Sequence, residues 1–355
     1  MPSLSDAAQA FAGMQLAFTE RRAVPEEGFM QDRSATFGYH ASHEQHPPSK
    51  LLEYVRLAEQ AGFDAAMCSD HFHPWIEQQG HSGFTWAWLG AALQATHLTF
   101  GCVNAPGWRY HPAVIAQAAA TLCEMYPQRF WLAVGSGEAL NEHITGEHWP
   151  AKDERNERLR ECVTVMRQLW AGETVTHRGR VIVEQAKLYT RPEKPPPIYG
   201  AALSAATAEW VGSWADGLIT LGAPAAKLAE VLAAFRAGGG EGKPVKVQAA
   251  LAWAPTQAAA RDGAWSQWRG NVVGGDVLGI LRTCADFEAA SQFVTADDVA
   301  ARLPVSCDPL EHAQRLQEYV DAGATDIYLF NVAPPQREFI EIFAEQVLPA
   351  VRGAR

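Results

Sequence analysis

From Thr36 to the end of the chain, short apolar runs alternate with amphipathic stretches. In the stretch 49–61, Leu51, Leu52, Val55 and Ala58 recur with helical spacing and leave polar residues opposite them, which predicts a helix packed on one face. The stretches 112–125 and 153–170 have the same pattern. The apolar runs between such stretches predict eight strands, at 36–41, 65–70, 98–105, 130–135, 197–202, 216–221, 245–253 and 326–332.

The junctions from helix to strand repeat one design. In "EQAGFDAAMCSD", "GSWADGLITLG" and "VDAGATDIYLFNV", Gly or Asp-Gly ends a helix and a nearly continuous apolar run follows. Such runs are typical of parallel strands that are buried on both faces. Eight repeats of strand and helix predict an α/β fold of the (β/α)8 TIM barrel type.

Three segments depart from this rhythm. We expect a single barrel domain over residues 35–355, with a hairpin insertion near 174–190 and an excursion near 255–300. Residues 1–34 include the polar stretch "TERRAVPEEGFMQDRS" and lack the apolar region and cleavage site of a signal peptide, so we expect an N-terminal tail.

Composition narrows the classes of partner. The formal net charge of −11 argues against nucleic acid or an anionic membrane surface, because such partners need an excess of Lys and Arg. No apolar run is long enough to span a membrane. With nucleic acid and membrane surfaces disfavoured as partners, we expect a small-molecule substrate. The six cysteines include no C-x-x-C pair, which favours free thiols in a reducing, cytoplasmic compartment.

Polar and aromatic residues gather where the first four strands end. These ends read "HASHEQ", "SDHFHPW", "NAPGWRYHP" and "GSGEALNEH", whereas the other four ends are bland. In such barrels the carboxyl ends of the strands carry the chemistry. In "SDHFHPW", His71 and His73, with His40 or His43, are candidate metal ligands of a hydrolase, but the later strand ends offer no obvious further ligands. A structural interpretation also stands, in which Asp70 caps a helix and the histidines are loop residues.

Four motifs together resemble one known family. "FGYHASHEQ", "SDHFHPW", "RYHPAVIAQAAATL" and "VGSGEALNEHITG" are similar to the luciferase-like (LLM class) flavin and deazaflavin oxidoreductases, close to the deazaflavin-dependent glucose-6-phosphate dehydrogenases. The resemblance covers about residues 36–222 and returns in "RLPVSCDP" and "QREFIEIFAEQVLPAVR". It implies a (β/α)8 barrel with a flavin-type ring at the mouth and hydride transfer or monooxygenation on a small organic substrate.

The resemblance also implies roles for single residues. His71 and Trp75 would face the reactive ring atom, and Glu138 would give or take the proton that accompanies the hydride, a task suited to a carboxyl whose pKa is raised by burial. Glu138 as an exposed loop residue is the alternative. The remaining implied contacts are cofactor binding by Asp70, Cys102, Val103, Asn141 and Ser204, and substrate binding by Glu44 and Arg302.

Two of these contacts have a stated form. In "FGCVNAP" the family has a bulge with a non-proline cis peptide, which we expect at Cys102–Val103. Ser204 is a natural helix N-cap, and the small residues around it would let the helix approach a phosphate group, although an ordinary cap without ligand explains it equally well.

Substrate and cofactor follow from departures within the family. The sugar-phosphate branch has lysines where this chain reads "TLGAPAAK" and "RTCADFEAASQF", and Arg302 alone matches a remaining cation, so glucose 6-phosphate is disfavoured. "HASHEQHPPS" and "VNAPGWRYHPA" resemble an FMN-using group, so FMN is the expected cofactor and the deazaflavin coenzyme F-420 is the alternative. We expect a homodimer without bound metal. The competing functions are a metal-dependent hydrolase and a barrel that binds a flavin without turnover.

Overall fold

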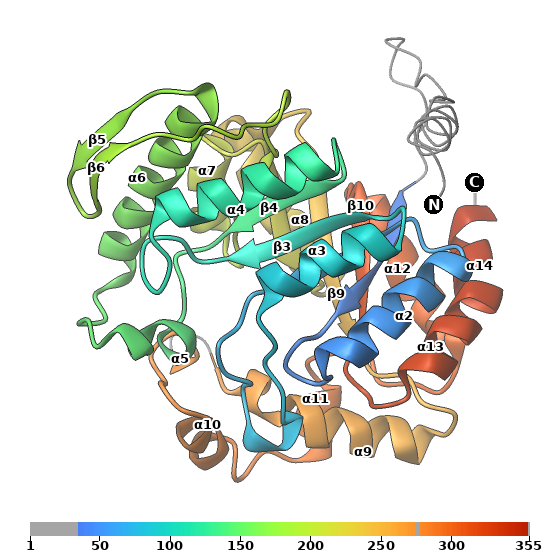
Figure 1. The fold of residues 1–355 in the computed structure, drawn as a ribbon. Coiled ribbons are helices and arrows are strands. Elements are labelled where there is room, and N and C mark those ends of the chain that lie inside the picture. Colours follow the sequence, from blue (N-terminus) through green and yellow to red (C-terminus); the bar gives the residue numbers. More distant parts are fainter. Residues whose placement is uncertain (1–34, 275–276, 354–355) are drawn as a thin grey trace, which may run out of the picture. The chain divides into compact units, whose positions relative to one another are not determined.

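The eight predicted strands close into one barrel. The computed structural model describes residues 35–274 and 277–353, so the predicted tail at 1–34 lies outside the described residues. All neighbouring strands of the barrel are parallel, in the order β1-β10-β9-β8-β7-β4-β3-β2 (Figure 1), which confirms the (β/α)8 prediction. The strands are β1 (Thr36–Ala41), β2 (Ala65–Ser69), β3 (Thr99–Asn104), β4 (Phe130–Val134), β7 (Ile198–Ala201), β8 (Gly217–Leu221), β9 (Val245–Leu251) and β10 (Asp326–Asn331).

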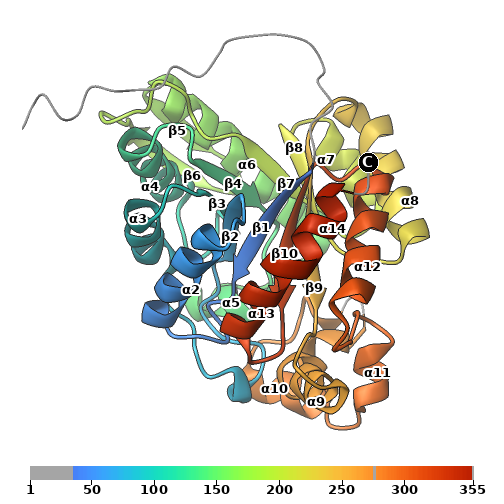
Figure 2. The same ribbon diagram turned by 90° about the vertical axis from the view of Figure 1, so that its right-hand side faces the viewer.

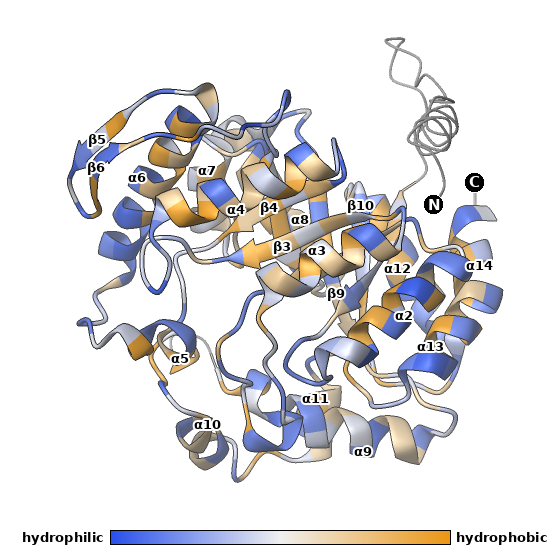
Figure 3. Cartoon of the chain, viewed as in Figure 1, coloured by the Kyte–Doolittle hydropathy of each residue, from blue (hydrophilic) through white to orange (hydrophobic). Residues whose placement is uncertain are grey.

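Amphipathic helices cover the outside of the barrel. In Figure 3 helices such as α2 and α6 carry hydrophobic residues on one side and hydrophilic residues on the other, which is the pattern that their sequences predict. The covering helices are α2 (Pro48–Gln60), α3 (Thr85–Ala95), α4 (Pro112–Met125), α6 (Lys152–Ala171), α7 (Ala205–Gly212), α8 (Ala225–Phe235), α12 (Pro309–Ala322), α13 (Gln336–Ile342) and α14 (Leu348–Gly353), with π-helical turns η4 (Arg236–Gly240) and η7 (Phe343–Val347).

Two segments stand outside the barrel. β5 (Val175–Arg178) and β6 (Ile182–Ala186) pair as an antiparallel hairpin beside α6. After β9, the chain forms α9 (Gln257–Trp268), η5 (Arg269–Val272), α10 (Cys284–Ala290) and α11 (Ala296–Ala300) before it returns to α12. Figure 2 shows these helices at the end of the barrel where α5 (Ala139–Glu142) lies, and the hydrogen bond from Ala139 N to Gly279 O (3.4 Å) joins the two.

Aromatic side chains fill the inside of the barrel. Trp131 on β4 lies with its ring centroid 5.2 Å from that of Tyr199 and 5.5 Å from that of Tyr328. Lys246 Nζ lies 4.6 Å from the Tyr199 centroid and 3.0 Å from an Asp326 carboxylate oxygen. The inside of the barrel is therefore a packed core, as in other barrels of this size, and leaves no room for a ligand between the strands.

The structure also bears on the expected free thiols and on the expected lack of a membrane-spanning segment. All six cysteines are free, and only Cys307 is more than slightly exposed. Along residues 35–274 and 277–353, we find no helix with both the length and the apolar character that crossing a membrane requires.

Candidate active site

Glu44 and His71 form a pair at the mouth of the barrel. Glu44 follows β1 and His71 follows β2, and because these strands are parallel neighbours their ends bring the two side chains together. His71 Nδ1 lies 3.4 Å from Glu44 Oε1, and Ser42 Oγ donates a hydrogen bond of 2.8 Å to the other oxygen. Burial acts to raise the pKa of Glu44, but His71, His40, a backbone hydrogen bond and the Ser42 hydroxyl together outweigh it, so the pKa lies below its ordinary value and the carboxyl is ionised.

Trp75 adds an apolar wall next to His71. Its ring centroid lies 5.3 Å from that of His71 and 5.2 Å from that of Phe287 in α10. The excursion after β9 thus supplies Phe287, which packs behind the tryptophan. Phe287, Ile76 and Leu140 form one buried apolar cluster, and Trp75 packs against it. His71 and Trp75 therefore lie together as the resemblance implies.

Glu138 occupies the N-cap position of α5, after β4. Burial raises the pKa of its carboxyl above the ordinary value, while His71, Arg155 and Lys152 act in the opposite direction. None of the hydrogen bonds found within 35–274 and 277–353 ends on its carboxyl oxygens. A carboxyl with a raised pKa and no internal hydrogen-bond partner is suited to act as an acid toward a ligand.

Asp70 is buried and accepts hydrogen bonds from three side chains. Asn104 donates at 2.7 Å, Trp86 at 3.1 Å and Tyr110 at 3.4 Å. Asn104 and Trp86 donate to Oδ2, whereas Tyr110 donates to Oδ1, and Arg109 Nη2 lies 3.3 Å from that same Oδ1. These partners hold Asp70 inside the protein, and its contact with a ring edge stays a prediction.

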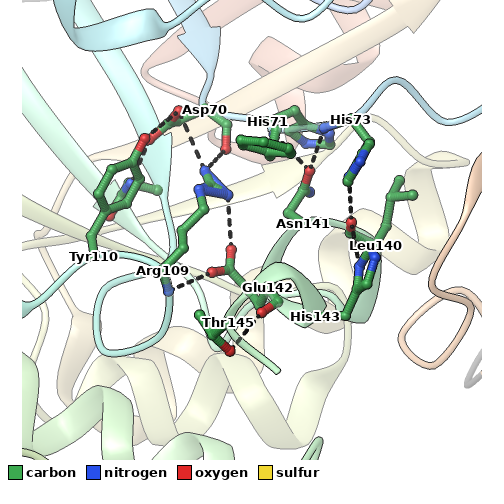
Figure 4. A network of polar contacts seen from close by, with 12 residues as sticks. Asp70, His71, His73, Arg109, Tyr110, Leu140, Asn141, Glu142, His143 and Thr145 are labelled. Carbon is green, nitrogen blue, oxygen red and sulfur yellow. Dashed lines mark hydrogen bonds and ion pairs between the residues drawn. The ribbon is translucent and has the colours of Figure 1, made fainter. Parts of the chain in front are cut away.

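Arg109 and Glu142 were missed by the sequence interpretation. Arg109 Nη1 donates to Glu142 Oε1 at 3.0 Å, and the Arg109 backbone N donates to Oε2 at 3.1 Å (Figure 4). Both side chains are almost completely buried. Arg109 lies in the motif "WRYHP" and Glu142 in the motif "ALNEH". The sequence signal that could have predicted the pair was one cation and one carboxylate in the polar ends of two neighbouring strands.

Asn141 fastens the loop that follows β2. Its Oδ1 accepts hydrogen bonds from the backbone N atoms of Phe72 (2.8 Å) and His73 (3.2 Å). His73 Nδ1 lies 2.9 Å from Leu140 O in the same helix. Asn141 is therefore a buried residue of α5 that positions the His71 loop, and a direct contact with the cofactor stays a prediction.

The histidines of "SDHFHPW" do not converge on one point. His71 faces Glu44, whereas His73 contacts Leu140 O and stacks on His143 with a centroid separation of 5.4 Å. Within residues 35–274 and 277–353 no group of three His, Cys, Asp or Glu side chains has an arrangement that could hold a metal ion. The hydrolase alternative thus gains no support from the geometry.

His40 and His43 also have separate surroundings. His40 stacks on Phe330 at 4.3 Å, and burial lowers its pKa to about 4, so it is neutral at neutral pH. His43 points edge-on at Trp88 in α3, 4.8 Å away, and is fully buried. Neither forms the second half of a metal site with His71.

The predicted cis peptide at Cys102–Val103 is wrong, because the described residues contain no cis peptide bond. β3 stays in regular register here: Cys102 pairs with Cys68 and Leu132, and Val103 pairs with Ser69 and Ala133. Asp70 N also donates to Val103 O at 2.9 Å. With ladders on both sides the strand has no bulge, and a trans peptide satisfies its backbone groups.

The two side chains of this peptide point to opposite sides of the strand. Cys102 packs in the core between strands and helices, whereas Val103 packs against the cluster inside the barrel. Val103 is thus the residue that faces the mouth. Cofactor contact by either residue stays a prediction.

The structure gives Ser204 and Arg302 no contact with Glu44 or His71 among the hydrogen bonds and ion pairs of the described residues. Ser204 is the N-cap of α7 and accepts from Thr207 N at 3.4 Å, so the cap prediction is confirmed and the phosphate contact stays a prediction. Arg302 is an exposed residue just after α11.

A cavity of about 710 Å³ lies between α6 and α7, lined by Lys152, Asp153, Asn156, Glu157, Arg160, Glu161, Ala206, Thr207 and Trp210.

Comparisons with known proteins agree with this geometry. The model of a family described as luciferase-like monooxygenase matches residues 31–326. The chain is 35% identical over 327 residues to an F420-dependent glucose-6-phosphate dehydrogenase of Microbacterium testaceum (strain StLB037), covering 89% of this chain and 97% of the relative. A similar protein of Segniliparus rotundus is 35% identical over 330 residues, covering 89% and 98%.

Solved structures agree as well. An F420-dependent secondary alcohol dehydrogenase in complex with an F420-acetone adduct has a TM-score of 0.84 and 32% identity, over 90% of this chain and 99% of that one. A coenzyme F420-dependent tetrahydromethanopterin reductase of Methanopyrus kandleri, at 19% identity and a TM-score of 0.72, covers 89% and 99% and shows the shared fold. The resemblance drawn from the motifs is confirmed. The chain belongs to the luciferase-like monooxygenase family, and it is an oxidoreductase of that family.

Proposed function

We propose that the protein oxidises a small, uncharged secondary alcohol, or reduces the matching ketone, with the deazaflavin coenzyme F420. The observation that carries this proposal is an imidazole, His71, at a barrel mouth with the ionised Glu44 on one side and the partly buried Glu138 nearby. The relatives at 35% identity and the alcohol dehydrogenase at 32% are F420-dependent, which favours F420 over the FMN that the motifs suggested.

The mouth fits a flat ring. Val103 and Ala201 present small side chains above the aromatic filling of the barrel. A methyl group placed on Gly135 would meet only the Ala201 Cβ, at 3.7 Å, so space lies open above β4. Asn104 Oδ1 is buried and has no hydrogen-bond partner among the described residues, which leaves it free for a ring edge. When bound, the deazaflavin ring supplies the hydride chemistry.

The chain's own residues move the protons. A carboxylate beside Nδ1 of His71 favours the tautomer with its proton on that nitrogen, so Nε2 is left as the base for the substrate hydroxyl. Glu44 then stabilises the imidazolium that forms. Glu138, whose pKa is raised above its ordinary value by desolvation, is the proposed acid of the site.

The charges of the site favour an uncharged substrate. Both Nη atoms of Arg109 contact Asp70 or Glu142, Arg155 Nη1 donates to Gly137 O at 2.9 Å, and Lys152 Nζ donates to Ser136 Oγ at 2.8 Å. Arg302 is exposed on the excursion. A phosphorylated sugar needs several cations that are free to bind it, and these residues do not offer them.

The test compares two cofactors and two substrates. The purified chain is mixed with F420 or with FMN, and reduction is followed by visible absorbance without oxygen, with 2-propanol or glucose 6-phosphate as donor. We expect reduction of F420 by 2-propanol and none by glucose 6-phosphate. Reduction of FMN alone, or a preference for glucose 6-phosphate, would overturn the proposal. A homodimer and a cytoplasmic location remain predictions, the first to be checked by light scattering.

A further inference from the structure

Arg109 sits between two parts of the chain that carry the reacting side chains. It lies in the loop between β3 and α4 and points into the space between the end of β2 and α5 (Figure 4). On one side its Nη2 contacts the backbone O and the carboxylate of Asp70, and on the other its Nη1 and its backbone N hold both carboxylate oxygens of Glu142. The side chains of Arg109, Asp70 and Glu142 are only 4%, 1% and 2% exposed.

The two partners of Arg109 are close in sequence to the proposed base and acid. Asp70 directly precedes His71, and Glu142 lies one helical turn after Glu138. Asn141 adds a second link between the same parts, through the backbone N atoms of Phe72 and His73. The loop that carries His71 and the helix that begins after Glu138 are therefore joined by contacts that the side chains of these two residues do not make.

A planar guanidinium is the group that such a link requires. Its fork makes several hydrogen bonds in fixed directions, whereas an ammonium in the same place would act as a point charge. Tyr110, the neighbouring residue, donates to Asp70 and lies under the guanidinium, 4.7 Å from it. The orientation of Arg109 is thus restricted on three sides.

We propose that Arg109 is a positioning residue that holds the His71 loop and α5 at one fixed separation, through Asp70 and Glu142. The inference rests on the proposed roles of His71 and Glu138. Loss of this link lowers the turnover number and leaves the Michaelis constant nearly unchanged, because the substrate still enters the mouth but meets a displaced base. Displacements of about 1 Å can cost about 100-fold in rate.

The test must avoid leaving a buried charge without a partner. Arg109→Met alone leaves the buried Glu142 carboxylate without its cation, which destabilises a fold strongly, whereas Asp70 keeps its hydrogen bonds from Asn104, Trp86 and Tyr110. Burial raises the pKa of Glu142 to about 7, against the opposing effect of Arg109, so a neutral side chain at this position is close to a state that the protein already populates. The decisive protein is therefore Arg109→Met combined with Glu142→Gln. Glu142→Gln alone and Arg109→Lys complete the series.

The first readout needs neither cofactor nor substrate. Hydrogen exchange of the backbone amides at 72 and 73 reports whether the loop is held. We expect exchange about 10-fold faster in the double variant and in Arg109→Lys, and close to wild type in Glu142→Gln, which keeps an acceptor for Arg109. The amides of β4 serve as an internal reference. Arg180→Met, which removes an exposed ion pair with Glu154 and Glu157 on α6, is the control.

The second readout is turnover with the cofactor and substrate that the first experiment identifies. We expect a fall in kcat of about 10- to 100-fold in the double variant, with KM within about 3-fold. Unchanged exchange at 72 and 73 overturns the proposal, whatever the turnover. Faster exchange with unchanged kcat overturns it as well. If no substrate is turned over by the wild type, the proposed function fails, and the exchange experiment still decides whether Arg109 holds the loop.

Discussion

The Glu138 carboxyl combines partial burial with the lack of a hydrogen-bond donor among the described residues. Elsewhere at the mouth, carboxyls are paired: Glu44 with His71 and Ser42, and Glu142 with Arg109. An unpaired buried carboxyl favours its neutral form, which costs less to desolvate than the charged form. This difference separates the proposed acid from the carboxylates that orient other groups.

We predict that Glu138→Gln lowers kcat about 100-fold and removes one limb of its pH dependence. The amide keeps the shape but holds no transferable proton. In the wild type, activity that needs protonated Glu138 falls as the pH rises through its raised pKa, whereas the variant has no such fall. Steady-state rates across pH measure this. Glu147→Gln, an exposed carboxyl paired with Arg158, is the control and should change little. An unaltered pH profile in Glu138→Gln contradicts the role.

The same substitution changes stability in a defined direction. Because the folded protein holds the Glu138 proton more tightly than the unfolded chain does, the stability from this group is present below its ordinary pKa of 4.5 and is lost as the pH rises through the raised value. Glu138→Gln removes that loss. Urea unfolding at pH 5 and pH 8 should therefore show a smaller decline with pH in the variant than in the wild type.

At the scale of elements, packing between β3 and β4 decides how the barrel is filled. Gly101 on β3 has no side chain, and the Trp131 ring from β4 occupies that place. A Cβ on Gly101 would lie 1.8 Å from the ring, far closer than a contact allows. The sequence pattern shows a glycine inside an apolar run and does not show which side chain it makes room for.

We predict that Gly101→Ala destabilises the protein by about 1–3 kcal/mol or more, because the tryptophan must move within a filled core. Gly90→Ala in α3 is the matched control, since nothing lies within 4 Å of its added methyl group. A glycine inside a helix costs about 0.5–1 kcal/mol relative to alanine, so this change should be neutral or stabilising. Urea unfolding measures both. Similar effects at the two positions would contradict this account of the barrel.

At the scale of the whole molecule, we predict which cofactor stabilises the fold and that no metal ion is needed. A cofactor that binds only the folded protein adds about 2.7 kcal/mol at a concentration 100 times its Kd. We expect F420 to raise Tm more than FMN does at equal concentration. Dialysis against a chelator should leave Tm and turnover unchanged, because His71 and His73 face different partners. Differential scanning fluorimetry measures the first, and loss of activity restored by a metal ion would contradict the second.

The barrel was predictable because its signal is repeated and local. The run "TFGYHA" became β1 with the same bounds, and the stretch 112–125 became α4 with the same bounds. Of the site, the strand ends indicated the face, because parallel strand ends meet at one face of a barrel, whereas the roles predicted for His71, Trp75 and Glu138 came from the resemblance to the family. The prediction of a cis peptide at Cys102–Val103 was wrong, because a feature of the family does not determine the hydrogen bonds that pair this strand with its neighbours.

The sequence by itself determined the period of the elements, the barrel and the face that carries the chemistry, because burial of apolar residues acts along short stretches of chain. Only the tertiary structure decided that Arg109 and Glu142, 33 residues apart, form an ion pair. It also decided that the His71 ring contacts Glu44 and does not converge with His73 on one site. Such pairings depend on distances of a few ångströms between loops from different strands. A local pattern carries no information about those distances.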